Sequence, residues 1–168
     1  MAIVSSAATG IRVASRATIV QLRAPALSIA ALERELNTLV ASARVPVLVS
    51  SRCDVALASA AAGVNLPESD ISVADARMLL GGRLIGRSVH SIAGAQLAEH
   101  QGADYVIFGP VWESASHPGT APAGLAALAK VVRSVSIPVL AIGGVTEARA
   151  AEALASGAAG YAAIRLFE

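Results

Sequence analysis

The sequence predicts an α/β protein in which strands and helices alternate around a parallel sheet. Short apolar runs alternate with longer segments of helical pattern along most of the 168 residues. The apolar runs contain few polar positions, which is typical of strands buried on both faces. A chain of this length usually forms one domain with one core, so we expect residues 1–168 to be a single domain.

The first half of the chain predicts four strands and four helices. Ser28 is a candidate N-cap, and Leu32, Leu36 and Leu39 then recur on one face of a helix. Pro46 ends that helical pattern and opens an apolar strand, because proline cannot continue a helix. The predicted elements of this half are at most a stub of a strand at 2–5, a helix at 7–15, a strand at 18–22, a helix at 28–43, a strand at 46–50, a helix at 54–61, a strand at 63–66 and a helix at 75–80.

The second half continues the same alternation and ends on a strand. Its clearest strand is the run YVIFGPV, which β-branched and aromatic residues dominate. Gly102 and Gly157 each follow a helical pattern, and we expect them to end those helices. The predicted elements are a strand at 84–90, a helix at 92–100, a strand at 105–111, a helix at 124–132, a strand at 138–144, a helix at 147–155 and a strand at 160–166.

Two architectures fit this alternation, a doubly wound open sheet and a (β/α)8 barrel. The stretch before the strand at 18–22 is short for a full strand, loop and helix. In the barrel, we therefore expect the first strand to be absent or reduced to a stub at 2–5. That would leave two unpaired sheet edges, so we expect a homo-oligomer in which another chain covers them.

Charge and composition exclude several classes of protein. A formal net charge of +1 gives no electrostatic case for binding nucleic acid or an anionic membrane. Cys53 is the one cysteine, so no internal disulfide forms. No run of about 18 apolar residues suggests a membrane span, and the N-terminus lacks the basic start of a signal peptide. We expect a cytoplasmic protein without a Walker A, GxGxxG, HExxH or GxSxG motif.

Polar residues near the ends of the predicted strands are the candidate site residues. In parallel βα proteins, functional groups gather at the carboxyl ends of the strands. Ser88 and His90 are two residues apart near one strand end, so their side chains face the same side. The candidates are Gln21, Arg23, Ser50, Ser51, Arg52, Asn65, Ser88, His90, residues 109–112, Gly143, Gly144 and Arg165.

Two loops offer groups for a phosphate. Gly143 and Gly144 end a strand and precede a helix, so their N–H groups can approach an anion beside a helix N-terminus. The alternative is a tight turn that needs glycine for a positive φ. A long loop rich in Ser, Thr, Gly and Pro supplies the hydroxyl groups of Ser114 and Ser116 and the ring of His117.

The segment GADYVIFGPVWESASHPG at 102–119 resembles the GADYV-FGPVF-T-TKPG segment of the thiamine phosphate synthase/TenI family. The likeness continues through IPVLAIGGVT at 137–146 and LIGRSVHS at 84–91, and it covers about residues 19–167. This resemblance implies a TIM barrel. The ligand it implies is a small phosphorylated heterocycle, such as thiazole phosphate, aminopyrimidine diphosphate or thiamine phosphate.

The resemblance also implies roles for single residues. Asp70 matches one metal carboxylate of the family, whereas Ser51 stands where the family has the second. Pro25 and His117 stand where the family has lysines. The implied ligand- or phosphate-binding residues are Gln21, Arg23, Ser114, Ser116, Gly143, Gly144 and Arg165.

Three functions remain open at this point. Our first expectation is a TenI-like protein of thiamine biosynthesis or salvage, with weak or no synthase activity. It would be a thiazole tautomerase (an isomerase) with His90, His117 and Ser88 as catalytic candidates and with no cofactor. The second is an active thiamine phosphate synthase (a transferase) that uses Mg²⁺. The third is a non-catalytic regulatory barrel that binds a phosphorylated ligand.

Overall fold

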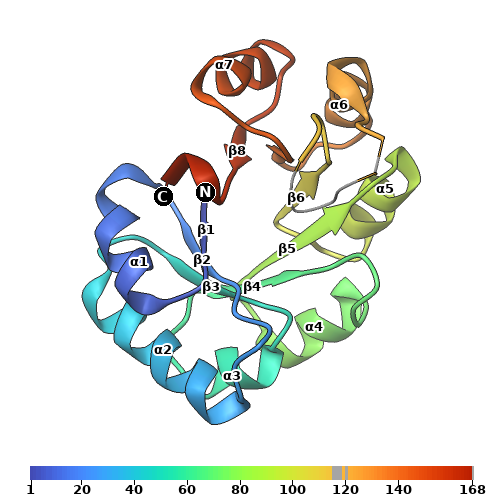
Figure 1. Ribbon diagram of the computed structural model, residues 1–168. Coiled ribbons are helices and arrows are strands. Elements are labelled where there is room, and N and C mark those ends of the chain that lie inside the picture. The colour runs from blue at the N-terminus through green and yellow to red at the C-terminus, as the bar shows by residue number, and fades with distance from the viewer. Residues whose placement is uncertain (115–118, 120, 168) are drawn as a thin grey trace.

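The computed structural model describes residues 1–114, 119 and 121–167, and it shows a barrel of parallel strands. Eight strands lie side by side in chain order, each paired in parallel with the next. Helices surround the strands (Figure 1). This strictly sequential order excludes the doubly wound sheet, whose strand order reverses at a switch point. The predicted barrel is confirmed.

The strands are β1 (Ala2–Val4), β2 (Val20–Leu22), β3 (Val47–Ser50), β4 (Gly63–Leu66), β5 (Leu84–Val89), β6 (Tyr105–Phe108), β7 (Val139–Ile142) and β8 (Gly160–Ala162). The α-helices are α1 (Ala7–Val13), α2 (Ile29–Ser42), α3 (Cys53–Leu57), α4 (Val73–Leu80), α5 (Ile92–His100), α6 (Gly124–Ser134) and α7 (Glu147–Ala155). Two 3₁₀ turns, η1 (Ala14–Arg16) and η2 (Arg165–Phe167), follow α1 and β8.

The expectation of an absent or reduced first strand is wrong. β1 has 3 residues, as many as β2 and β8, and it pairs with β2 along its whole length. On its other side, the Ile3 N–H donates to Ala163 O at 2.9 Å, and the Ala163 N–H donates to Met1 O at 3.2 Å. The short segment before β2 suffices because α1 has only 7 residues. Both edges are therefore paired within one chain. Unpaired edges thus give no reason to expect a homo-oligomer.

Several strands end earlier than predicted, two of them where the loop turns at proline or glycine. β6 ends at Phe108, before the cis Gly109–Pro110 peptide, and β7 ends at Ile142, before two glycines with positive φ. The last strand ends at Ala162, and η2 follows it. Each early end leaves more chain in the loops at the carboxyl rim, where sites of this fold form.

Hydroxyl side chains fix the starts of five helices. Each accepts a hydrogen bond from the backbone N–H three residues further on, which satisfies one of the free donors of the first turn. Ser28 has this role in α2, as predicted. The full set is Ser6, Ser28, Ser72, Ser91 and Thr146.

Two apolar regions hold the barrel together. The larger fills the space between the strands and the surrounding helices, where Leu36, Leu39 and Leu128 are fully buried. The smaller fills the inside of the barrel and consists of Met1, Ile3, Leu48, Tyr105, Ile107 and Ala162. In the described part of the chain, no helix is long and apolar enough to cross a membrane.

Candidate functional site

Polar side chains from four neighbouring strands form hydrogen-bonded pairs inside the barrel. The Gln21 Nε2 group of β2 donates to Ser50 Oγ of β3 at 2.6 Å. The Asn65 Nδ2 group of β4 donates to Ser88 Oγ of β5 at 3.0 Å. Both amide side chains are almost fully buried, with 2% of Gln21 and 4% of Asn65 exposed. The structure therefore brings four of the predicted candidates together.

Each of these amides keeps one unsatisfied acceptor. Gln21 Oε1 and Asn65 Oδ1 are buried and have no hydrogen-bond partner among the described residues. A buried acceptor without a donor costs about 1–3 kcal/mol, so such atoms call for an explanation. Gln21 pairs in register with Ile3 and Leu48, which belong to the interior cluster. The inside of the barrel thus contains two acceptor atoms that lack a donor among the described residues.

The turn after β3 has an unusual backbone, and its charges are paired. Ser51 has a φ of 66°, a conformation that side chains other than glycine rarely adopt. Its N–H donates to Asn65 O at 3.0 Å, which joins the turn to the next strand. Beside it, Arg52 Nε donates to Asp54 Oδ1 at 2.8 Å, and this contact lowers the pKa of Asp54 to about 2. Arg52 is therefore engaged by a neighbour.

The structure places His90 between two protein groups. Its Nδ1 atom is hydrogen-bonded to Gly109 O, and its Nε2 atom lies 3.8 Å from Glu68 Oε2. Glu68 Oε1 also accepts from the His90 backbone N–H at 3.3 Å. Ser88 contacts Asn65 instead, so the predicted pair of Ser88 and His90 shares no hydrogen bond in the described chain. The sequence analysis did not select Glu68 as a candidate site residue, because its partners lie on other loops.

Arg87 holds the loop that carries Asp70. Its guanidinium donates to Ile71 O at 2.7 Å, to Glu68 O at 2.7 Å and to Asp70 O at 3.3 Å. Partial burial lowers the pKa of Arg87. The Asp70 carboxylate itself accepts from the Ile71 N–H at 2.8 Å.

The described residues do not fit a metal ion held by protein groups alone. They contain no cluster of three or more His, Cys, Asp or Glu side chains with suitable placement. Asp70 is the one predicted metal carboxylate, and Ser51 supplies a hydroxyl group where a second carboxylate was expected. We therefore derive no chemical step through a metal.

Two glycines shape the loop after β7. Gly143 and Gly144 have φ values of 95° and 66°. A Cβ atom on Gly143 would lie 2.6 Å from Pro110 Cβ, and one on Gly144 would lie 2.3 Å from Glu113 O. The loops after β6 and β7 thus pack too closely for any side chain at either position. Of the predicted neighbours, Ser114 is described, whereas Ser116 and His117 lie outside the described residues.

Arg149 is a cation at this loop that the sequence analysis missed. Its Nη1 atom donates to Gly144 O at 2.8 Å, and its Cζ atom lies 5.6 Å from the centroid of the Trp112 ring. The predicted cation Arg165 is instead exposed at the start of η2. Arg149 lies in a helix rich in Ala and Glu, where an arginine usually faces solvent, so the sequence analysis did not select it.

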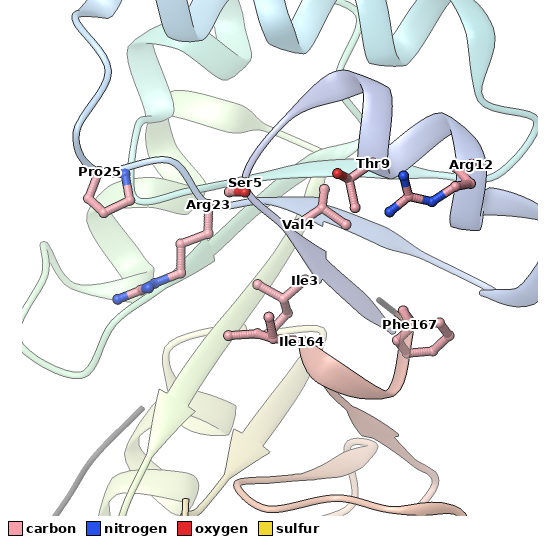
Figure 2. Close-up of a pocket in the computed structure, with 9 residues that line it drawn as sticks. All are labelled: Ile3, Val4, Ser5, Thr9, Arg12, Arg23, Pro25, Ile164 and Phe167. Carbon is pink, nitrogen blue, oxygen red and sulfur yellow. The ribbon is translucent and has the colours of Figure 1, made fainter. Parts of the chain in front are cut away.

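A pocket of about 480 Å³ lies beside β1. Figure 2 shows Arg23 and Arg12 on opposite sides of it, with Ser5 and Thr9 between them. Its apolar wall comes from Ile3, Val4, Ile164 and Phe167. Arg23 is the one predicted ligand residue that lines this pocket.

Eight sequential parallel strands with polar residues at one rim define a TIM-barrel protein. The sequence model of the family described as thiamine monophosphate synthase matches residues 3–167. The chain belongs to this family, which confirms the resemblance seen in the sequence.

Two relatives named thiamine-phosphate synthase support this assignment. The protein of Chloroflexus aurantiacus is 43% identical over 131 residues, which cover 77% of this chain and 61% of that protein. The protein of Methanoculleus marisnigri is 43% identical over 140 residues, which cover 82% of this chain and 65% of that protein. The chain thus spans less than two thirds of the length of either relative.

Solved structures show the same barrel. The thiamine phosphate pyrophosphorylase of Pyrococcus furiosus superposes with a TM-score of 0.88 at 32% identity, covering 97% of this chain and 83% of that chain. FabK of Thermotoga maritima has a TM-score of 0.81 at 21% identity, covering 99% of this chain and 58% of that chain. The second likeness concerns the fold alone.

Proposed function

We propose that this barrel is a thiamine-phosphate synthase that couples an aminopyrimidine diphosphate to a thiazole phosphate. The observation that carries the proposal is the pair of buried acceptors, Gln21 Oε1 and Asn65 Oδ1, inside the barrel. An amino-substituted heterocycle has the N–H donors that these atoms lack. Two relatives named as synthases, each 43% identical, add support.

Such a substrate would be oriented by side chains that are already fixed. Ser50 and Ser88 hold the amide groups of Gln21 and Asn65. Because the amides are buried and held, little side-chain freedom is lost when the ring binds. A ring without N–H donors would leave the Gln21 and Asn65 oxygens unpaired when it binds. A site built from buried polar groups discriminates strongly against such a ring.

The phosphate of the second substrate would bind at the loop of Gly143 and Gly144. The loop precedes α7, whose N-terminus has free N–H groups and a favourable dipole. The N–H groups of Gly144 and Val145 have no acceptor in the described part of the chain. A phosphate monoester supplies acceptor oxygens for them.

The coupling step releases diphosphate, whose growing negative charge must be stabilised. Arg23 is exposed at the rim directly after β2 and supplies one positive charge there. Arg52 is paired with Asp54, so it contributes less to a ligand. In our proposal, arginine side chains supply this positive charge.

One observation favours a second candidate, the TenI-like protein with weak or no coupling activity. Asp70 is the one carboxylate left at the expected metal position, and removal of a single well-placed electrostatic group typically costs about 10²–10³ in rate. A proton transfer without a metal would avoid that loss. Both ring nitrogens of His90 face protein groups, which leaves Ser88 as the other catalytic candidate among the described residues.

The test is a steady-state assay with aminopyrimidine diphosphate and thiazole phosphate, with and without Mg²⁺. We expect formation of thiamine phosphate by the unmodified chain and a higher Mg²⁺-dependent rate in Ser51→Asp. Tight binding of thiazole phosphate without coupling in either protein would contradict the synthase. Interconversion of thiazole phosphate tautomers would then support the TenI-like candidate, and its absence would support the regulatory barrel.

A further inference from the structure

We propose that Arg149 binds the phosphate group at the loop of Gly143 and Gly144, as a guanidinium held in place by Trp112. This inference rests on the phosphate site of the proposed function. It adds the cation of that site, which Arg165 was expected to supply. The ligand class is a phosphate monoester, whose oxygens match the planar fork of N–H donors on arginine.

The position of Arg149 is fixed from three directions. Its backbone N–H donates to the N-cap Thr146 Oγ1 at 3.3 Å, which sets the first turn of α7. Its Nη1 atom donates to Gly144 O at 2.8 Å. Its Cζ atom lies 5.6 Å from the centroid of the Trp112 ring, within the range of a cation–π contact. The guanidinium is therefore held beside the glycine loop before any ligand arrives.

The charge of Arg149 is not neutralised by a carboxylate in the part of the chain that the structure describes. The ion pairs found there are those of Arg52, Arg77 and His90. Glu147, in the same helical turn, forms no ion pair with Arg149. A guanidinium has five N–H donors, and the contact with Gly144 O uses one of them. Donors remain for phosphate oxygens.

The loop of Gly143 and Gly144 also packs closely against Arg149 and Trp112. A Cβ atom on Gly144 would lie 3.2 Å from Arg149 Nη1 and 3.0 Å from Trp112 Cβ. The Trp112 N–H donates to Gly143 O at 3.3 Å, which ties the two loops together. The free N–H groups of Gly144 and Val145 and the guanidinium thus belong to one packed unit. A phosphate beside the loop would meet both kinds of donor.

Trp112 makes the inference directly measurable, because the chain has one tryptophan. Fluorescence of Trp112 is recorded while inorganic phosphate is added at constant ionic strength, with chloride as the reference salt. We expect a saturable change in the unmodified chain. In Arg149→Met, which keeps an apolar stem on the ring, the phosphate affinity is expected to fall about 10-fold to 100-fold, the range for a hydrogen bond to a charged group. Arg149→Lys is expected to recover part of it.

The control variant is Arg133→Met, which removes an exposed arginine from the last turn of α6 and is expected to leave phosphate affinity unchanged. Calorimetric titration of these proteins and of Gly144→Asp gives the affinity independently of the tryptophan signal. Equal affinities in the unmodified chain and Arg149→Met, with binding lost in Gly144→Asp, would overturn the role of Arg149 and leave the proposed site standing. Absence of phosphate binding in the unmodified chain would overturn both.

Discussion

The Tyr105 ring of β6 packs directly on Gly86 of β5 inside the barrel. A Cβ atom on Gly86 would lie 2.0 Å from Tyr105 Cζ and 2.3 Å from its hydroxyl oxygen. Tyr105 is 6% exposed, and burial raises the pKa of its hydroxyl group. The single large ring in the interior cluster therefore depends on the absence of a side chain on the neighbouring strand.

Gly86→Ala is expected to destabilise the fold. The added methyl group must displace the ring or shift β5, and overpacking of this kind typically costs about 1–3 kcal/mol. Urea unfolding of the variant measures the loss. Gly82→Ala is the matched control, since a Cβ atom there meets nothing within 4 Å. Equal midpoints for both variants would show that the interior accommodates the extra methyl group.

The alternation of strands and helices was predictable because strong apolar runs alternate with helical patterns, and the structure keeps that order. The alternation alone left two architectures open, and the family resemblance selected the barrel. Element ends were less accurate. Pro110 and the pair Gly143–Gly144 set two of them through tertiary contacts that the local pattern does not contain. The first strand has 3 residues, too few to show a strand pattern in the sequence. Its hydrogen bonds to β2 and Ala163 are nevertheless complete.

The candidate site was predictable where it depends on strand ends. The sequence analysis selected Gln21, Ser50, Asn65 and Ser88 because parallel strands place their carboxyl ends together. In the structure Gln21 contacts Ser50, and Asn65 contacts Ser88. It missed Glu68 and Arg149, whose roles come from contacts between different loops. Such contacts leave no spacing pattern in a single sequence.

The ion pair of Arg52 and Asp54 predicts an acid-sensitive contribution to stability. The pKa of Asp54 in the folded chain is about 2, below the ordinary value of 3.8. The charged form is therefore favoured by folding, so the contribution is present above about pH 4 and is lost as the pH falls toward 2. Because the pair is exposed, we expect a small effect.

Thermal unfolding of the unmodified chain and of Asp54→Asn between pH 2 and pH 6 provides the measurement. The difference in Tm is expected to be largest near pH 6 and to shrink toward pH 2. Arg52→Met, which removes the partner, is expected to give the same pH dependence as Asp54→Asn. A constant difference across the range would exclude this ion pair as its source.

The buried acceptor of Gln21 predicts a substrate-specific defect. In Gln21→Leu, the KM for aminopyrimidine diphosphate is expected to rise about 10-fold, as for the loss of one neutral hydrogen bond, while the KM for thiazole phosphate stays unchanged. The free energy of unfolding is expected to change by less than about 1.5 kcal/mol, because the Leu side chain leaves no unpaired amide.

Steady-state kinetics with each substrate varied in turn measures this difference. Gln96→Leu, which removes an exposed amide from α5, is the control and is expected to behave like the unmodified chain. An equal rise of both KM values in Gln21→Leu would point to a general disturbance of the barrel and against a specific contact with the aminopyrimidine.

Gly144→Asp is expected to abolish phosphate binding. The new side chain would start 2.3 Å from Glu113 O, and its carboxylate would place a negative charge beside the N–H groups of Gly144 and Val145. Phosphate at 100 times its Kd stabilises a folded protein by about 2.7 kcal/mol, and this increase is expected to vanish in the variant. Gly81→Asp is the control for backbone strain, because Gly81 also has a positive φ of 57° but has open space around its Cα. It is expected to lower the Tm without phosphate and to keep the full rise in Tm when phosphate is added. A phosphate-dependent rise of equal size in Gly144→Asp would place the phosphate elsewhere on the barrel, with the pocket between Arg12 and Arg23 as the next site to test.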